Sequence, residues 1–201
     1  MNRNELEYLH YILPIETVPL VREHGLLSHR RAKKIPHTSI AMPEIQDIRK
    51  TVVVPNARPL HEYVNLYFNP RNKMMSKVRF GFGVEHKTLC VLQVDPSVLD
   101  LPGVIITDQN ASSKYCRFFP SPSGLVVIDK DFIFANSWKH PDDQILEWRH
   151  GSAVCAEVLV PDRIDWDRVK GAYVSCEEAE TKLRQVTPDL PITIEPVRFF
   201  A

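Results

Sequence analysis

Late in the sequence stands the apolar run Ala153-Val154-Cys155-Ala156-Glu157-Val158-Leu159-Val160, which contains a single carboxylate. A run of this length and β-branched content predicts a buried strand. By the two-residue period of a strand, Glu157 shares a face with Cys155 and Leu159, so the run does not simply turn a polar side to water. An ionised carboxylate is expensive to bury unless a partner compensates it. Glu157 is therefore either a functional carboxylate held in a cleft or a structural one, in an ion pair or at a sheet edge.

The rest of the chain is also rich in short apolar runs. These runs predict strands at residues 66–68, 88–94, 104–107, 125–128, 172–174 and 192–194. Helices are expected at residues 16–24, which Gly25 ends, at 43–50, and at 176–185, where Ser175 and Glu178 fit a capping box. Many short strands with few helices predict an α+β or mainly β fold rather than a doubly wound parallel sheet.

Length and composition are those of one ordinary folded domain, which we expect to span residues 1–201. Lysine plus arginine and aspartate plus glutamate balance at 25 each, so any nucleic-acid surface must be local. With only 7 glycines there is no phosphate-binding glycine loop, and the 4 cysteines form no zinc-binding pair. We see neither a signal peptide nor a membrane span, and therefore expect a cytoplasmic protein without a metal site.

One stretch combines aromatic and basic residues. It reads Tyr67-Phe68-Asn69-Pro70-Arg71-Asn72-Lys73 and continues to Lys77 and Arg79. An aromatic pair beside a loop of cations suits stacking on bases and contact with phosphates. A strand followed by a solvated turn explains the same pattern equally well.

Two earlier residues have both structural and functional interpretations. His10 precedes the helix that Gly25 ends, and a lone histidine is more often a solvated or a satisfied core residue. Arg49 lies in the expected helix at 43–50, where a charge is normally solvent-exposed. Neither residue identifies a function by itself.

Taken in order, these pieces resemble the DarT family of DNA ADP-ribosyltransferase toxins. The specific strings are Tyr67-Phe68-Asn69-Pro70-Arg71-Asn72 and Ala156-Glu157-Val158-Leu159-Val160-Pro161. Weaker matches precede or separate them: His10-Tyr11-Ile12 with Gly25-Leu26-Leu27, Ile45-Gln46-Asp47-Ile48-Arg49, and Asp108-Gln109-Asn110-Ala111-Ser112-Ser113. Family members often carry two adjacent arginines at the motif around Arg49, where this chain has Ile48 before a single arginine.

The resemblance implies an ADP-ribosyltransferase fold of two packed antiparallel β-sheets with a few short helices, holding NAD in the cleft between the sheets. It implies transfer of ADP-ribose from NAD to a base in single-stranded DNA, most often thymine, with release of nicotinamide. It also implies pairing with a DarG-type macrodomain antitoxin, and no metal.

The resemblance further implies residue roles. Glu157 would bind the nicotinamide ribose and stabilise the oxocarbenium-like charge, and Arg49 would stabilise the anionic acceptor base. The NAD-binding residues would be His10, Ile12, Gly25, Leu26, Tyr67 and Phe68. Residues 134–149 would form the DNA-recognition loop, and the DNA-binding residues would be Arg71, Lys73, Lys139, His140, Trp148 and Arg149.

Other functions fit the same sequence. An enzyme of this fold can act on RNA or protein instead, as an RNA 2′-phosphotransferase or a protein-directed ADP-ribosyltransferase does. A catalytically silent nucleic-acid-binding module would retain the basic loop at 71–79. In a structural or partner-binding domain, the clustered cations around Arg31 and Lys73 would form only a solvated face.

Overall fold

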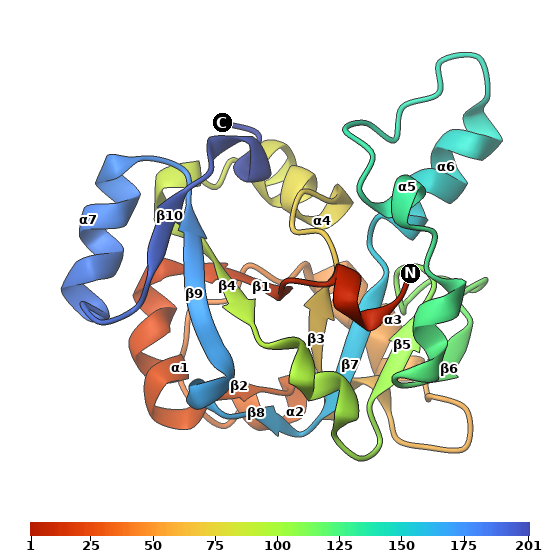
Figure 1. The fold of residues 1–201 in the computed structure, drawn as a ribbon, viewed down its shortest axis with the longest axis horizontal. Helices are drawn as coiled ribbons and strands as arrows, with labels where there is room; N and C mark the ends of the chain where they lie inside the picture. Colours follow the sequence, from red (N-terminus) through yellow and green to blue (C-terminus); the bar gives the residue numbers. More distant parts are fainter.

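The computed structural model describes all 201 residues and has an α+β fold (Figure 1). The ten strands are β1 (Leu9–Pro14), β2 (Leu26–Leu27), β3 (Tyr63–Tyr67), β4 (Leu89–Val94), β5 (Ile105–Thr107), β6 (Phe118–Pro120), β7 (Glu157–Pro161), β8 (Arg163–Ile164), β9 (Val169–Val174) and β10 (Ile192–Ile194). The seven helices are α1 (Val18–His24), α2 (His29–Ala32), α3 (Pro43–Thr51), α4 (Lys73–Ser76), α5 (Lys130–Ile133), α6 (Gln144–Ala153) and α7 (Glu177–Val186). The predicted α+β class is therefore confirmed.

The strands form one main sheet, in the order β10-β9-β4-β1-β3-β7-β5-β6, and a small sheet of β2 and β8. The pairs within the main sheet are antiparallel except for β10 beside β9, so the sheet is mixed. The expectation of two packed antiparallel sheets is wrong in this respect. Strands β1 and β3 are joined by a single register pair, His10 with Tyr67, whereas β1 and β4 share six. The two expected layers are thus two halves of one sheet that meet at a short junction.

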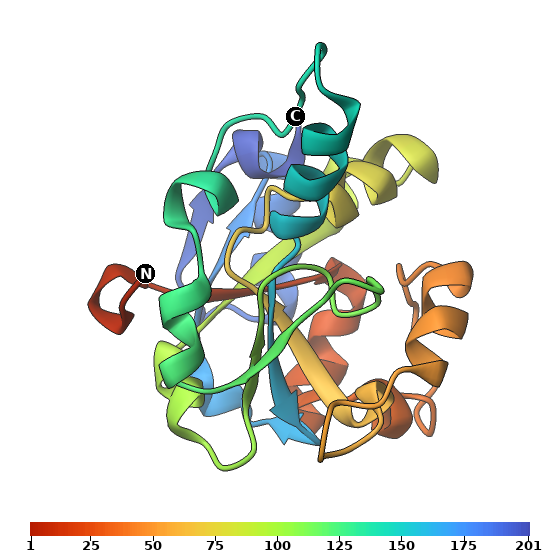
Figure 2. The same ribbon diagram turned by 90° about the vertical axis from the view of Figure 1, so that its right-hand side faces the viewer.

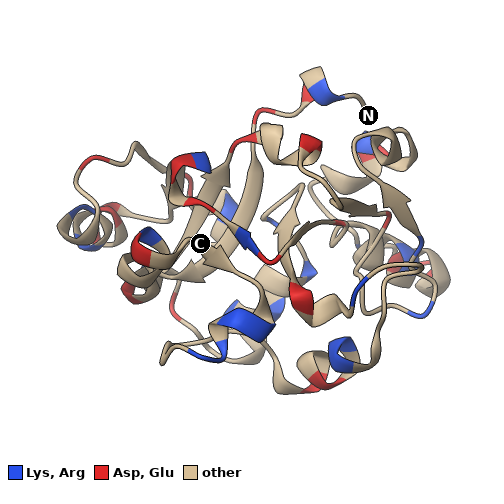
Figure 3. Ribbon diagram, turned by 90° about the horizontal axis from the view of Figure 1, so that it is seen from below, with Lys and Arg blue, Asp and Glu red and all other residues tan.

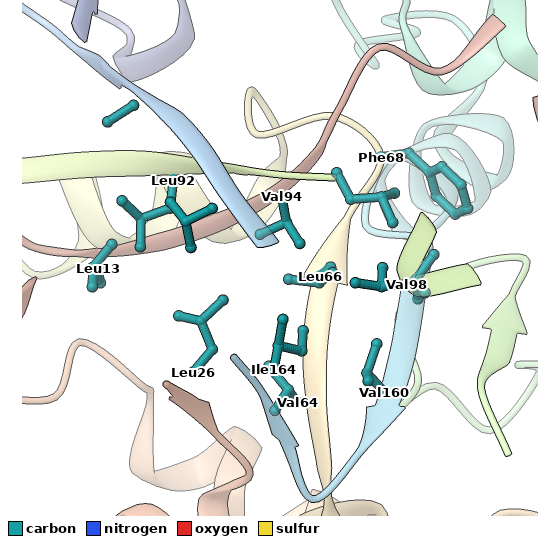
Figure 4. Packing of buried hydrophobic residues seen from close by; sticks show 14 of the residues in the cluster. Leu13, Leu26, Val64, Leu66, Phe68, Leu92, Val94, Val98, Val160 and Ile164 are labelled. Atoms are coloured by element: carbon teal, nitrogen blue, oxygen red, sulfur yellow. The ribbon is translucent and has the colours of Figure 1, made fainter. Parts of the chain in front are cut away.

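The larger core lies on one face of this sheet. Strands β1, β3, β4 and β7 alternate their side chains, and the residues that enter this core include Leu13, Leu66, Leu92 and Val160. Figure 4 shows these side chains converging with Leu26 and Ile164 of the small sheet. Helices α1 and α7 complete this core with their apolar sides. The core anchors β1, β3 and β7 firmly, and the site lies on their opposite face.

Helices α3, α4 and α6 surround that opposite face. Helix α3 stands apart from the body of the sheet in Figure 2, and α4 and α6 lie together near its upper end. A second apolar cluster fills this side, with Ile12, Tyr67, Met75 and Cys155 among its members. The polar residues His10, Asn65 and Glu157 lie on the same face, because they alternate with the core residues along β1, β3 and β7.

Most of the predicted elements occur, with shifted ends. Helices α1, α3 and α7 and strands β3, β4, β5, β9 and β10 overlap the expected ranges. The expected strand at 125–128 is wrong, since Ser123–Val127 is a 3₁₀-helix whose three-residue spacing buries Leu125 and Ile128 together. The capping box of α7 is also wrong, because its N-cap is Cys176, which makes no side-chain cap, and Ser175 Oγ lies 2.8 Å from His86 Nδ1.

The expected strand at 153–160 begins later than predicted. Helix α6 extends to Ala153, turn hydrogen bonds join Ala156 to Ala153 and Cys155 to Ser152, and β7 begins only at Glu157. The carboxylate therefore lies at the first position of the strand rather than at its centre. This position places it against the end of α6.

Basic and acidic residues are interspersed along the ribbon rather than gathered by sign (Figure 3). None of the helices combines the length and the apolar character needed to cross a bilayer. No cluster of three or more histidine, cysteine, aspartate or glutamate side chains is placed to hold a metal ion.

Candidate active site

A cavity of about 500 Å³ opens on the face of the sheet opposite the larger core. Its floor includes Ile12 of β1 and Asn65 and Tyr67 of β3. Its walls come from α1 and the turn after it, from residues 35–49, from α4, and from Trp148 to Ser152 of α6. A volume of this size suits a cofactor-sized ligand.

Glu157 and Arg49 form a buried ion pair at this cavity. Arg49 Nη1 and Nη2 donate to the two carboxylate oxygens of Glu157 at 2.9 and 3.0 Å. The side chain of Glu157 is 0% exposed and that of Arg49 is 7% exposed. Arg49 lines the cavity and covers Glu157, so the carboxylate lies directly behind the guanidinium. A two-bond pair of this kind fixes both groups in one orientation.

The loop after β5 also holds the carboxylate. The Ala111 N–H donates to Glu157 Oε1 at 3.0 Å, and the Glu157 N–H donates to Thr107 Oγ1 at 2.9 Å. Thr107 Oγ1 in turn donates to the Gln109 carbonyl at 2.8 Å. Among the hydrogen bonds in the structure, Oε1 of Glu157 thus accepts two and Oε2 accepts one.

Burial and the ion pair together set the protonation of this region. Burial lowers the pKa of Arg49, but the charge and hydrogen bonds of Glu157, with the neighbouring Tyr67 and Cys116, outweigh it, so the net pKa is raised and the guanidinium stays charged. Burial and then the Glu157 charge raise the pKa of Tyr67 well above its ordinary value. Burial, with the Glu157 charge next, raises the pKa of Cys116 to about 12. The Tyr67 phenol and the Cys116 thiol are therefore both neutral at pH 7, and neither adds a second negative charge beside Glu157.

The opposite wall depends on the glycine that ends α1. Gly25 has φ of +78°, a conformation that other residues rarely adopt, and its N–H donates to the Val21 carbonyl. A Cβ at this position would lie 2.4 Å from the Ile164 carbonyl oxygen of β8. Gly25 thus lets the chain turn tightly into β2, which pairs with β8 beside the cavity. The expectation that Gly25 ends the helix is confirmed.

Four of the six residues expected to bind NAD line the cavity: Ile12, Gly25, Leu26 and Tyr67. Phe68 does not, because it follows Tyr67 and points to the opposite side, into the larger core, where it is fully buried. His10 does not line the cavity either. Its Nδ1 donates to the Phe68 carbonyl at 3.0 Å, and burial lowers its pKa to about 4. The structure therefore gives both residues a position behind the cavity wall.

The residues expected to bind DNA are divided. Lys73 and Trp148 line the cavity, and the Trp148 side chain is among the large exposed apolar groups. Arg71 instead donates to the Val197 carbonyl at 3.0 Å and to the Asn136 carbonyl at 2.6 Å, with its guanidinium 4.2 Å from the ring centre of Phe200. Arg71 therefore connects its own loop to the segment at Asn136 and to the C-terminal segment at 197–200.

The expected recognition loop at 134–149 is partly helical, because α6 begins at Gln144. Lys139 pairs with Glu147 at 2.8 Å, and His140 Nε2 lies 2.8 Å from His150 Nδ1. Arg149 is exposed on α6. Intramolecular contacts of Lys139 and His140 thus hold the loop against the helix.

Sequence reasoning missed several cavity residues. Lys77, which was predicted only as part of the basic stretch and not as a site residue, follows α4 and lines the cavity beside Lys73; the four-residue spacing of the two lysines indicated that they share a helix face. The irregular segment 35–42 supplies a large part of one wall, and Asn110 lies near Glu157. An irregular segment has no periodic pattern from which such a role could be read.

Comparison with known proteins identifies relatives of this chain. Residues 10–200 match the family model described as "ssDNA thymidine ADP-ribosyltransferase, DarT". The chain is 28% identical over 205 residues to a DNA ADP-ribosyl transferase–DNA ADP-ribosyl glycohydrolase fusion protein of Thermosipho africanus, and it spans about half (49%) of that protein's length. It is 25% identical over 185 residues to a DNA ADP-ribosyl transferase of Thermus sp., covering 88% of this chain and 85% of the relative.

Solved structures show the same fold. Thermosipho africanus DarTG in complex with ADP-ribose superposes with a TM-score of 0.83 at 26% identity, covering 96% of this chain and 51% of that one. Thermus sp. 2.9 DarT in complex with ADP-ribosylated ssDNA has a TM-score of 0.84 at 20% identity, over 99% of both chains. The same Thermus protein in complex with NAD+ has a TM-score of 0.79 over 97% of this chain and 98% of that one, also at 20% identity.

Proposed function

This chain belongs to the DarT family of ssDNA thymidine ADP-ribosyltransferases, as its motifs predicted, and we propose that it transfers ADP-ribose from NAD to thymine in single-stranded DNA. Nicotinamide is the product released. The observation that carries the proposal is the buried Glu157–Arg49 pair in the wall of a cofactor-sized cavity. One relative of known structure supports it, because Thermus sp. 2.9 DarT has been solved in complex with NAD+ and in complex with ADP-ribosylated ssDNA.

Glu157 is the group that stabilises the positive charge on the ribose as nicotinamide leaves. When the glycosidic bond to nicotinamide breaks, positive charge develops on the ribose, and a fixed carboxylate beside it lowers the barrier by roughly 3–4 kcal/mol. Oxygen Oε2 accepts one bond in the structure and has capacity to accept a ribose hydroxyl. Because Arg49 covers the carboxylate, the Arg49 guanidinium must shift when the ribose reaches Oε2.

Arg49 is the group at the acceptor base. A guanidinium does not give up its proton under ordinary conditions, and the adjacent Glu157 raises its pKa further. It therefore stabilises the anionic form of thymine rather than accepting the proton of the ring nitrogen, which is released to solvent water. The new bond from that nitrogen to the ribose carbon replaces the bond to nicotinamide, which leaves as a neutral molecule. A displaced Arg49 remains at the cavity wall, where it can meet a base arriving from the open side.

The remaining cavity residues keep the roles that the family resemblance implies. In this proposal Gly25 and Leu26 contact the adenosine side of NAD and Tyr67 contacts the nicotinamide side, while Ile12 lies on the cavity floor. His10 and Phe68 act from behind, by supporting the strand junction beneath Tyr67. Trp148 at the cavity wall offers a stacking surface for a neighbouring base, and Arg149, exposed next to it on α6, is available for a phosphate contact.

The proposed enzyme has an expected compartment and an expected protein partner. Residues 1–201 form one ADP-ribosyltransferase domain that acts as the toxin of a pair, in the cytoplasm. Its partner is a DarG-type macrodomain antitoxin, since a relative of this chain is fused to a DNA ADP-ribosyl glycohydrolase. No metal takes part in the reaction as proposed.

The test is a comparison of acceptors. Radiolabelled NAD is incubated with the protein and with single-stranded DNA, single-stranded RNA or a protein mixture, and the label on each acceptor is counted. Labelled DNA with released nicotinamide supports the proposal. Label on RNA or protein alone favours another transferase of this fold, and no nicotinamide release favours a silent binding module.

A further inference from the structure

The cavity has an unusual balance of charge. Among the residues that line it there is no aspartate or glutamate, whereas Arg49, Lys73 and Lys77 are all cationic. The Arg49 charge is matched by Glu157 behind it. Lys73 and Lys77 make none of the ion pairs in the structure, in contrast to Lys130, Lys139 and Lys182, which each pair with a glutamate. Two positive charges without an ion-pair partner thus meet in one concave site, and the Glu147 carboxylate, which pairs with Lys139, also feels the Lys73 charge.

The local backbone brings the two lysines together. Asn72 begins α4 by accepting the Met75 N–H on its side-chain oxygen at 3.0 Å. Helix α4 then passes without interruption into a π-helical turn, Lys77–Gly81. Lysines four residues apart at this junction lie on the same side, which here faces the cavity. Single π-helical turns of this kind are frequent at functional sites.

Two glycines leave room for the lysine side chains. A Cβ built on Gly81 would lie 2.8 Å from Lys77 Cδ, so the lysine stem occupies the space a side chain would take. A Cβ on Gly151 of α6 would lie 3.3 Å from Lys73 Nζ. The Lys77 stem therefore lies against Gly81 and the Lys73 ammonium group lies against Gly151, while both lysine side chains remain exposed to solvent.

We propose that Lys73 and Lys77 form an anion subsite that binds a phosphate group of one of the two substrates. The inference rests on the proposed function, which supplies two sources of phosphate: the pyrophosphate of NAD and the phosphodiester beside the target thymidine. A lysine is a compact charge suited to either, and a cavity with about half of its lining hydrophobic strengthens the attraction. Two like charges that lack an ion-pair partner repel each other, and a bound phosphate offsets that repulsion.

The primary variant is Lys77→Gln, which removes one charge and keeps a similar stem. Gly81→Ala is a second variant, which displaces the Lys77 stem without removing its charge. Lys182→Gln on α7 is the matched control, because it makes the same charge change at a helix that contributes nothing to the cavity lining. Thermal unfolding establishes that each variant is folded.

Two probes separate the two phosphate sources. ADP-ribose affinity is measured by calorimetry, and affinity for a fluorescent thymine-containing single-stranded oligonucleotide is measured by anisotropy, both between about 50 and 200 mM salt. For the phosphate source that the subsite binds, Lys77→Gln weakens the affinity about tenfold. It also reduces the slope of the logarithm of the binding constant against the logarithm of the salt concentration by about one. Gly81→Ala weakens the affinity for the same probe.

The outcomes are distinct. Weaker ADP-ribose binding alone assigns the pyrophosphate, and weaker oligonucleotide binding alone assigns the phosphodiester; either supports the subsite. Affinities and salt slopes of Lys77→Gln within twofold of those of Lys182→Gln, for both probes, overturn it. Failure of the wild-type protein to label DNA overturns the proposed function instead, and it leaves the ADP-ribose measurement free to decide on the lysines.

Discussion

The buried pair of Arg49 and Glu157 makes a quantitative prediction about stability. Their side chains are 7% and 0% exposed and share two hydrogen bonds. Removing either partner leaves a buried group without its counter-charge, which costs about 3–5 kcal/mol. Arg49→Met and Glu157→Gln should therefore each lower the melting temperature by roughly 6–20 °C, at about 2–4 °C per kcal/mol for a domain of this size.

The double variant tests whether the two costs have one cause. Glu157→Gln retains an oxygen that can accept the Ala111 N–H, so the loop after β5 keeps its hydrogen bond. When Arg49→Met is already present, Glu157→Gln no longer leaves a buried guanidinium without its counter-charge. The double variant should therefore be more stable than the sum of the single changes by about 2–3 kcal/mol.

Urea unfolding at pH 7, followed by circular dichroism, measures the four free energies of this cycle. The matched control is the exposed pair of Arg184 and Glu180 on α7, with side chains 49% and 26% exposed. The same substitutions there should show a coupling of only about 0.3–0.5 kcal/mol. Additivity of the Arg49 and Glu157 changes to within about 0.5 kcal/mol would refute the reasoning, because it would mean that the two charges do not depend on each other.

Three further predictions concern other parts of the molecule. Burial holds the pKa of His10 at about 4, below its ordinary 6.5, so the unfolded chain takes up the proton first as the pH falls. His10 should then contribute a loss of about 3 kcal/mol in unfolding free energy between pH 6.5 and 4, and His10→Gln should reduce the dependence of the unfolding free energy on pH in that range. The same dependence on pH in His10→Gln and in the wild type, measured by urea unfolding at each pH, would contradict it. Gly25→Ala should cost on the order of 2 kcal/mol or more, measured as a lower melting temperature, because of its positive φ and the 2.4 Å approach to Ile164; an unchanged value would contradict the tight turn. Annealing the complementary strand should sharply reduce labelling of an oligonucleotide, since pairing occupies the thymine ring nitrogen; equal labelling of both forms would rule out that acceptor atom.

Apolar runs with clear ends were predicted well from the sequence. Residues 88–94 were predicted as a strand and contain β4, five of whose six residues are apolar, and the helix expected to begin at Pro43 does begin there as α3. Glu157 was conspicuous because a carboxylate in an apolar run needs a partner. What could not be read was the identity of that partner, since Arg49 lies 108 residues away and only the tertiary fold brings the two together.

The errors have physical causes that the residues themselves explain. Neighbouring strand residues point to opposite faces, so Tyr67 and Phe68 could not both line one cavity. The cations of the basic stretch differ in their partners: Arg71 is bound by backbone carbonyls from distant segments, whereas Lys77 is not. Helix α6 was missed because its exposed face carries Ile145 and Trp148, which removes the amphipathic pattern that would have revealed it.

The most direct test of the account is mass spectrometry of nucleosides from single-stranded DNA treated with the protein and NAD. We expect an ADP-ribosyl adduct on thymidine for the wild-type protein, and for Glu157→Gln a yield lower by roughly two to three orders of magnitude with ADP-ribose binding retained. A digest without any nucleoside adduct, or a variant with wild-type yield, would contradict it.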